Sequence, residues 1–120
     1  MERLITIDKA DSSKHIIKGV VYKPNEPDTQ GDWMSAEEIE KMAYLFMKRS
    51  SMNSIDTNHD YNYIHSYVCE SYIARADDPD GYPEGSWVVC IKVEDDDIWA
   101  GIENGEFAGL SMAGIAKAVE

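Results

Sequence analysis

The sequence predicts an α+β domain in which a small, largely antiparallel β-barrel is flanked by two helices. Three observations support this fold class: short runs of β-branched residues recur, two segments carry helix start signals, and turn-forming residues separate the runs. The predicted order is β-β-α-β-β-β-α-β, and short antiparallel strands of this kind can close into a barrel. With 120 residues the chain can bury one core, so residues 1–120 are predicted to form a single domain.

Four of the predicted strands are read from composition alone. Residues 4–7 and 15–22 are rich in Ile, Leu and Val, which favour the extended backbone. Residues 86–93 are apolar at successive positions, a pattern typical of a central strand that is buried on both faces. The last strand follows Gly105 and contains Ser111.

A hairpin is predicted between residues 55–59 and residues 68–72, because both segments alternate with a period of two. Opposite residues in such a pair have Cβ atoms about 5 Å apart, and the register we expect places His59 opposite Glu70. The residues predicted to share one face of the second strand are Val68, Glu70 and Tyr72.

Both helices are predicted from their ends. Ser35 and Glu38 have the spacing of a capping box, and Met34 and Ile39 have the spacing of a hydrophobic staple. Apolar residues then recur every three or four positions, so this helix should pack one face on the sheet. Residues 94–104 predict a shorter helix, which begins with acidic residues and ends at Asn-Gly.

The net charge of −12, from 11 basic and 23 acidic residues, argues against direct binding of nucleic acid or anionic lipid. No apolar run approaches the roughly 20 residues that cross a membrane, and no secretory signal is found, so we expect synthesis in the cytosol.

Neither a disulfide nor a metal site is predicted. Cys69 and Cys90 lie in strand-like runs without CxxC spacing, so we expect two buried free thiols. The acidic turn at residues 75–85 resembles a calcium loop, but that alignment places Ala76 and Trp87 at two essential ligand positions. The turn is therefore interpreted as solvated, and no cofactor is expected.

One serine and one histidine form a candidate catalytic pair. Ser111 lies in GEFAGLSMAG, where small neighbours would let a peptide approach and glycine amides can face an oxyanion. A serine hydroxyl needs a base, for which His59 is suited, and the base needs a third group, for which Glu70 is available. The residues alone leave open whether Ser111 is a nucleophile or packs within a strand.

Four segments together resemble one protein family. They are GVVYKPNEPDTQGDWMSAEEIEKMAYLFM from Gly19, IDTNHD from Ile55, VCESYIA from Val68 and GSWVVCIKVEDDDIWAGIENGEFAGLSMAG from Gly85. The family is that of the XkdF-like phage serine proteases, which is similar to the prohead maturation proteases and, more distantly, to the herpesvirus assemblins. The resemblance implies a Ser-His endopeptidase on a small barrel. It would be made in the host cytoplasm, built into the procapsid, and would cut scaffold and the scaffolding segment of the major capsid protein.

Carried over to this sequence, the resemblance assigns Ser111 in GLSMAG as the nucleophile and His59 in NHD as the general base. Glu70 in VCES is the expected third member, while His65 would match the second histidine of the assemblins and Asp60 is a further alternative. A homodimer is compatible with the resemblance, because related proteases act as dimers or within the procapsid. The alternative function is a phage assembly module that keeps the barrel without catalysis.

Overall fold

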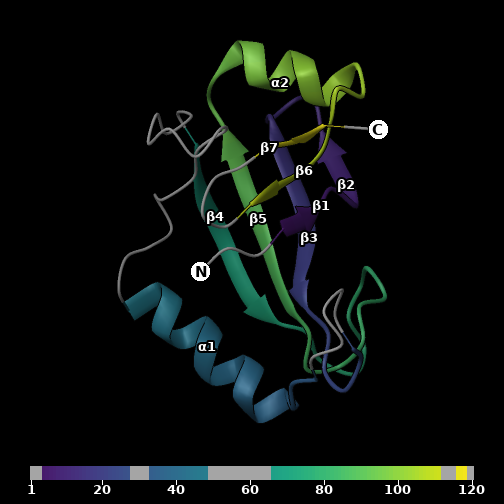
Figure 1. Cartoon of the computed structure of the whole chain (residues 1–120), viewed down its shortest axis with the longest axis vertical. Helices are drawn as coiled ribbons and strands as arrows, with labels where there is room; N and C mark the ends of the chain where they lie inside the picture. The colour runs from purple at the N-terminus through teal and green to yellow at the C-terminus, as the bar shows by residue number, and fades with distance from the viewer. Residues whose placement is uncertain (1–3, 28–32, 49–65, 112–115, 119–120) are drawn as a thin grey trace.

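The computed structural model describes residues 4–27, 33–48, 66–111 and 116–118, and for Leu4, Ser111 and residues 116–118 it describes the backbone only. The elements in chain order are β1 (Leu4–Thr6), β2 (Lys9–Asp11), β3 (Ile16–Tyr22), α1 (Ala36–Lys48), β4 (Ser66–Ile73), β5 (Trp87–Val93), α2 (Asp96–Glu103), β6 (Phe107–Ser111) and β7 (Ala116–Ala118). Figure 1 shows α2 across the top of the molecule, α1 at its lower left, and the strands between them.

The described strands form two antiparallel sheets, one with the order β1-β6-β7 and one with the order β2-β3-β5-β4. The predicted α+β class, with antiparallel pairing and two helices, is confirmed. The predicted closed barrel is wrong for the described strands, because the two sheets share no ladder. Two predicted features, the strand at residues 55–59 and its hairpin, lie outside the described residues.

The sheets are separate because the chain changes sheet just after β1. The Ile7 amide donates to the Ala108 carbonyl at 3.1 Å in one sheet, and the next amide, that of Asp8, donates to the Lys18 carbonyl at 2.9 Å in the other. β1 also lies against the face of β3: a Cβ added to Gly19 would be 2.2 Å from the Thr6 carbonyl oxygen. Face-to-face packing of this kind cannot continue a ladder around a barrel.

One hydrophobic core joins the two sheets and the two helices. Every second residue of β5 from Trp87 to Val93 is fully buried in it, as are Ile5 of β1 and Leu110 of β6. The Phe46 ring of α1 packs edge-on against Trp87, with ring centroids 5.6 Å apart. β5 lies between β3 and β4, so the prediction that this run forms a central strand is confirmed.

Local capping accounts for both helices. The Glu38 amide donates to Ser35 Oγ at 3.2 Å and the Ser35 amide donates to Glu38 Oε1 at 3.3 Å, which is the predicted capping box. At the second helix Asp95 Oδ1 accepts from the amides of Asp97 and Ile98 at 2.9 and 3.0 Å. Both helix predictions are confirmed.

A β-bulge in β4 corrects two predictions. Val68 pairs with Ile91 and Glu70 pairs with Cys90, so Cys69 is the extra residue. The bulge changes the phase of the strand: Val68 enters the core, whereas Glu70 and Tyr72 lie on the other face, contrary to the prediction of one shared face. It also leaves Cys69 exposed, and only Cys90 is buried as expected; both are free thiols.

Two short strands were not predicted. β2 has three residues, all exposed, and β7 has three residues after the predicted last strand. Strands of this length lack the alternating pattern from which sequence-based prediction starts.

The contact between β1 and β3 yields a stability prediction. Gly19→Ala should lower the free energy of unfolding by about 3 kcal/mol or more, because the new methyl group would collide with backbone that cannot move aside. Gly81→Ala is the control, because a Cβ at Gly81 meets no atom within 4 Å. Only the φ of +79° disfavours alanine there, so the free energy of unfolding should fall by about 1 kcal/mol. Urea unfolding of the three proteins measures both losses, and equal losses would contradict the close packing of β1 on β3.

Candidate active site

Ser111 is the last residue of β6, the central strand of the three-stranded sheet. Its backbone lies opposite Leu4 of β1, and Gly109 lies between Thr6 of β1 and Lys117 of β7. The preceding residue, Leu110, is fully buried beside Ile5. The packing of Leu110 in the core therefore fixes the position of the neighbouring Ser111 backbone.

Of the predicted partners of Ser111, Glu70 lies within the described residues. His59, Asp60 and His65 lie outside the described residues, as does the Ser111 side chain. The catalytic pair of Ser111 and His59 therefore stays a prediction from the sequence.

Glu70 is placed, and it lies on the outer face of the four-stranded sheet. Val89 and Ile91 belong to the core, so Cys90 between them points to the opposite face, and its cross-strand partner Glu70 shares that face. Burial and a hydrogen bond with Glu70 raise the pKa of the Cys90 thiol to about 12. The sheet that contains Ser111 packs on the core side, so the structure does not bring Glu70 to that side of β4; its role as third member stays a prediction.

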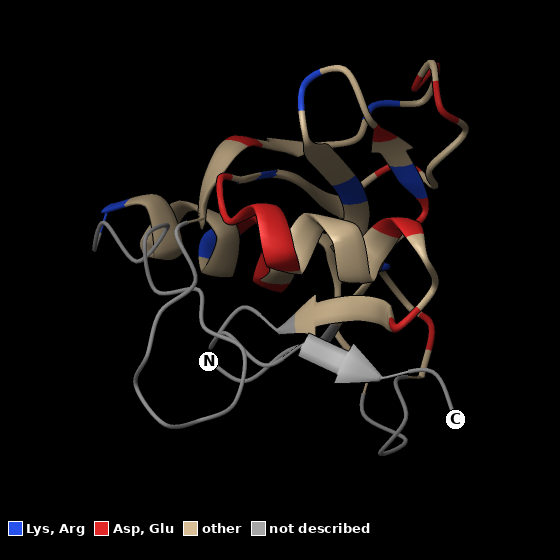
Figure 2. Cartoon of the chain, turned by 90° about the horizontal axis from the view of Figure 1, so that it is seen from above, with Lys and Arg blue, Asp and Glu red and all other residues tan. Residues whose placement is uncertain are grey.

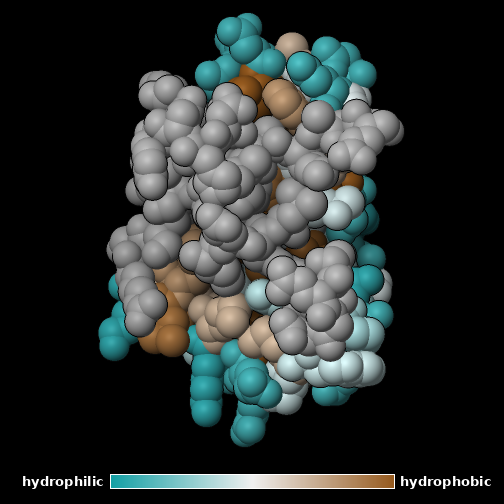
Figure 3. All heavy atoms as spheres, viewed as in Figure 1, coloured by the Kyte–Doolittle hydropathy of each residue, from teal (hydrophilic) through white to brown (hydrophobic). Residues whose placement is uncertain are grey.

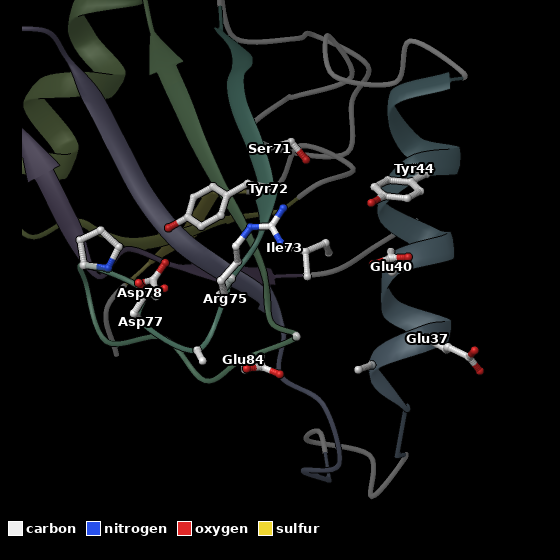
Figure 4. A pocket seen from close by; sticks show the side chains of 15 residues that line it. Glu37, Glu40, Tyr44, Ser71, Tyr72, Ile73, Arg75, Asp77, Asp78 and Glu84 are labelled. Carbon is white, nitrogen blue, oxygen red and sulfur yellow. The ribbon is translucent and has the colours of Figure 1, made fainter.

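A groove of about 870 Å³ lies between α1, the end of β4 and the loop after β4. Figure 4 shows Tyr44 pointing from α1 toward β4, with Glu40 one turn away on the same helix and Arg75 on the opposite wall. Gly85 lets the loop approach the helix, because a Cβ at this residue would be 3.0 Å from the Cβ of Ala36. Sequence analysis missed the groove, since its walls are distant in sequence and the loop was interpreted only as a solvated turn.

The loop that forms one wall of the groove is held to the sheet by charge. The Asp80 carboxylate forms ion pairs with Lys18 of β3 and, at 2.6 Å, with Lys9 of β2. The Tyr82 hydroxyl donates to Asp8 Oδ2 at 2.9 Å. The hydrogen bonds from Lys18 and Lys9 lower the pKa of Asp80 to about 2. The groove therefore has one wall that depends on the ionised form of Asp80.

Most of the exposed charge is negative. Figure 2, which looks down on α2, shows acidic residues along its first turn and in the neighbouring loops.

Apolar side chains are also exposed at the C-terminal part of α1, where Figure 3 shows brown atoms at the lower left; they include Leu45 and Met47. No helix within the described residues is long and apolar enough to cross a membrane.

Comparison with known proteins gives the family. A family described as "Putative phage serine protease XkdF" matches residues 3–120. This chain belongs to the XkdF family. The "Phage-like element PBSX protein XkdF" of Bacillus subtilis (strain 168) is 40% identical over 121 residues, which cover 98% of this chain and 42% of that protein. The "Uncharacterized protein YqbD" of the same strain is 40% identical over 119 residues, which cover 97% of this chain and 36% of that protein.

The chain thus spans less than half the length of these curated relatives. No solved structure shows a significant match to it. Membership in the XkdF family confirms the resemblance found in the sequence, and the family description associates the chain with phages and with serine proteases.

The ion pairs of Asp80 predict an acid-dependent loss of stability. Because the pKa of Asp80 is lowered from its ordinary 3.8 to about 2, its stabilising effect is complete above pH 4 and is lost as the pH falls through 2. Asp80→Asn should lower the free energy of unfolding at neutral pH and flatten its pH dependence in that window. Asp77→Asn, in the same loop, is the control, and identical pH profiles for the native protein and Asp80→Asn would contradict the ion pairs.

Proposed function

We propose that this chain is a serine endopeptidase of phage capsid maturation, with Ser111 as its nucleophile and His59 as its general base. The observation that supports it best is the placement of Ser111 in a chain of the XkdF family. Ser111 ends β6, the central strand of its sheet, and the preceding residue, Leu110, is buried in the core. A nucleophile on a rigid strand loses little entropy when a substrate is aligned with it.

In the proposed mechanism His59 removes the proton of the Ser111 hydroxyl while the oxygen attacks a peptide carbonyl. Backbone amides next to the glycines around Ser111 would donate to the oxyanion. His59 then protonates the leaving amine, and the ester that remains on Ser111 is hydrolysed by a water molecule that His59 deprotonates.

The third member of the site is proposed as Glu70, with Asp60 and His65 as alternatives. Such a group holds the imidazole in one tautomer and stabilises its charged form. The Glu70 carboxylate lies beside the Cys90 thiol on the outer face of the sheet, which weighs against Glu70 relative to the other two.

The proposed substrates are scaffold and the major capsid protein precursor, and the proposed place of action is the procapsid assembled in the host cytoplasm. A homodimer is the proposed assembly. Since the chain spans less than half of its relatives, these statements concern the activity of the whole protein to which such a domain belongs.

The nucleophile is tested by Ser111→Ala. The variant should lose at least about a thousandfold in turnover, because the hydroxyl that forms the acyl-enzyme is gone. It should also lose labelling by a fluorophosphonate while keeping the native unfolding midpoint. Intact-mass measurement of the phage's scaffold and capsid precursor, co-expressed with each variant, detects cleavage.

Ser13→Ala is the matched control, since Ser13 is exposed in the turn after β2 and bonds to Asp11. It should keep both cleavage and labelling. Cleavage by Ser111→Ala at the native rate would remove Ser111 from the mechanism. Intact substrates with a folded native protein inside assembled procapsids would favour the assembly module.

The role of Glu70 is tested by comparing Glu70→Gln with His59→Ala. A group that only orients the base costs less when it is removed than the base does, so Glu70→Gln should retain roughly a hundredfold more activity than His59→Ala. The measurement is kcat/KM on the cleaved precursor as a function of pH. Equal losses would show that Glu70 does more than orient His59.

A further inference from the structure

The groove between α1 and β4 has the dimensions of a site for an extended polypeptide. Its lining residues on α1 run from Ala36 to Tyr44, which corresponds to roughly 12 Å along the helix axis at 1.5 Å per residue. An extended chain advances about 3.3 Å per residue, so roughly four residues fit along this wall. The groove is partly open to solvent, which leaves an entry for a polypeptide chain.

The lining of the groove is strongly acidic. Among the described residues, five acidic residues and one arginine line it, and of these the Glu37 side chain points away from β4 (Figure 4). Within the described residues one of the carboxylates, that of Asp78, accepts hydrogen bonds from the amides of Asp80 and Tyr82 and so helps to shape the loop. No ion pair joins any of the other lining carboxylates to a described residue. These carboxylates belong to Glu37, Glu40, Asp77 and Glu84.

Arg75 is the single cation among the described lining residues, and it forms no ion pair with a described residue. It lies across the groove from Glu40 and Tyr44 (Figure 4). Tyr44 is 61% exposed, and Ile73 on the β4 side of the groove is partly buried. An exposed aromatic ring next to carboxylates suits the aliphatic stem and the cationic end of Lys or Arg.

We propose that this groove binds a basic, extended segment of the polypeptide substrate. The inference rests on the proposed function in one respect, namely that the bound segment belongs to the protein that is cleaved. Charge complementarity determines the class of segment: carboxylates outnumber the one cation in the lining, so a Lys- or Arg-containing segment is attracted and an acidic one is repelled. The groove would thereby select where on a substrate the protease acts.

Peptide binding to the Ser111→Ala protein tests the groove independently of catalysis. The probes are fluorescein-labelled peptides of alternating Lys and Ser, or of alternating Glu and Ser, measured by fluorescence anisotropy at about 0.1 M salt. The Lys peptide should bind and the Glu peptide should not. Glu40→Gln combined with Glu84→Gln should weaken binding of the Lys peptide by roughly three- to tenfold, as expected for two partly exposed charges.

The matched control is Glu94→Gln combined with Asp97→Asn, which removes the same charge at the other end of β5 and on α2. It should leave binding of the Lys peptide within about twofold of the parent value, since screening limits charge effects to about 10 Å at moderate salt. Equal weakening by the two double variants would show a general charge effect and would overturn the site.

Arg75→Gln gives a prediction of opposite sign. Removal of the one cation should tighten binding of the Lys peptide, because its repulsion is lost. If Arg75→Gln weakens the Lys peptide, or if the native groove prefers the Glu peptide, the groove is not a site for basic segments.

A final measurement connects the groove to cleavage. On a precursor that the native enzyme cuts, the Glu40→Gln, Glu84→Gln variant should raise KM and leave kcat unchanged, as loss of uniform binding does. An unchanged KM would mean that the bound segment is not part of the substrate. If the native protein cleaves no precursor but still binds the Lys peptide selectively, the proposed protease function is wrong and the groove remains a site for basic segments.

Discussion

The close approach of β1 to β3 is the contact on which the arrangement of the two sheets depends. Gly19 leaves room for the Thr6 carbonyl directly over β3, where any side chain would collide with it. Because β1 pairs with β6, this contact also determines how far β6 lies from the four-stranded sheet. The buried pair of Ile5 and Leu110 then fills the space between the layers. The backbone position of Ser111 is thus a consequence of a missing side chain on a strand of the other sheet.

β5 connects this arrangement with the groove. Its core-facing residues belong to the same core as residues of both helices and of the three-stranded sheet, and it pairs with β4, whose last residues line the groove. The Trp87 indole donates to Ser71 Oγ at 3.0 Å, so the first residue of β5 also holds the groove end of β4. A rigid central strand is expected to keep two surfaces at a fixed separation, which suits an enzyme that binds a segment at one place and reacts at another.

Sequence patterns predicted the elements whose signals are local. The capping box at Ser35 and the apolar run of β5 each determine one element without reference to the rest of the chain, and both were predicted correctly. The bulge at Cys69 has no local signal, since it arises from a mismatch between β4 and β5, and it moved Glu70 and Tyr72 to the other face. The closed barrel failed for a similar reason: whether β1 pairs with β3 or packs on it depends on tertiary contacts. For the candidate site, the sequence supplied the residues and the resemblance supplied their roles, but the groove required the structure.

The charge of the chain affects which polymers can approach the groove. A domain with a net charge of −12 repels the phosphate backbone of DNA, which is abundant where phage heads assemble. The same negative charge attracts basic polypeptide. At close range, a groove lined by acidic residues can bind such a segment through both its charge and its shape. Salt screens this attraction within about 8 Å at physiological ionic strength, so only a segment already near the groove experiences it strongly. The selectivity we infer therefore operates where substrate is concentrated around the enzyme, as it would be inside a procapsid.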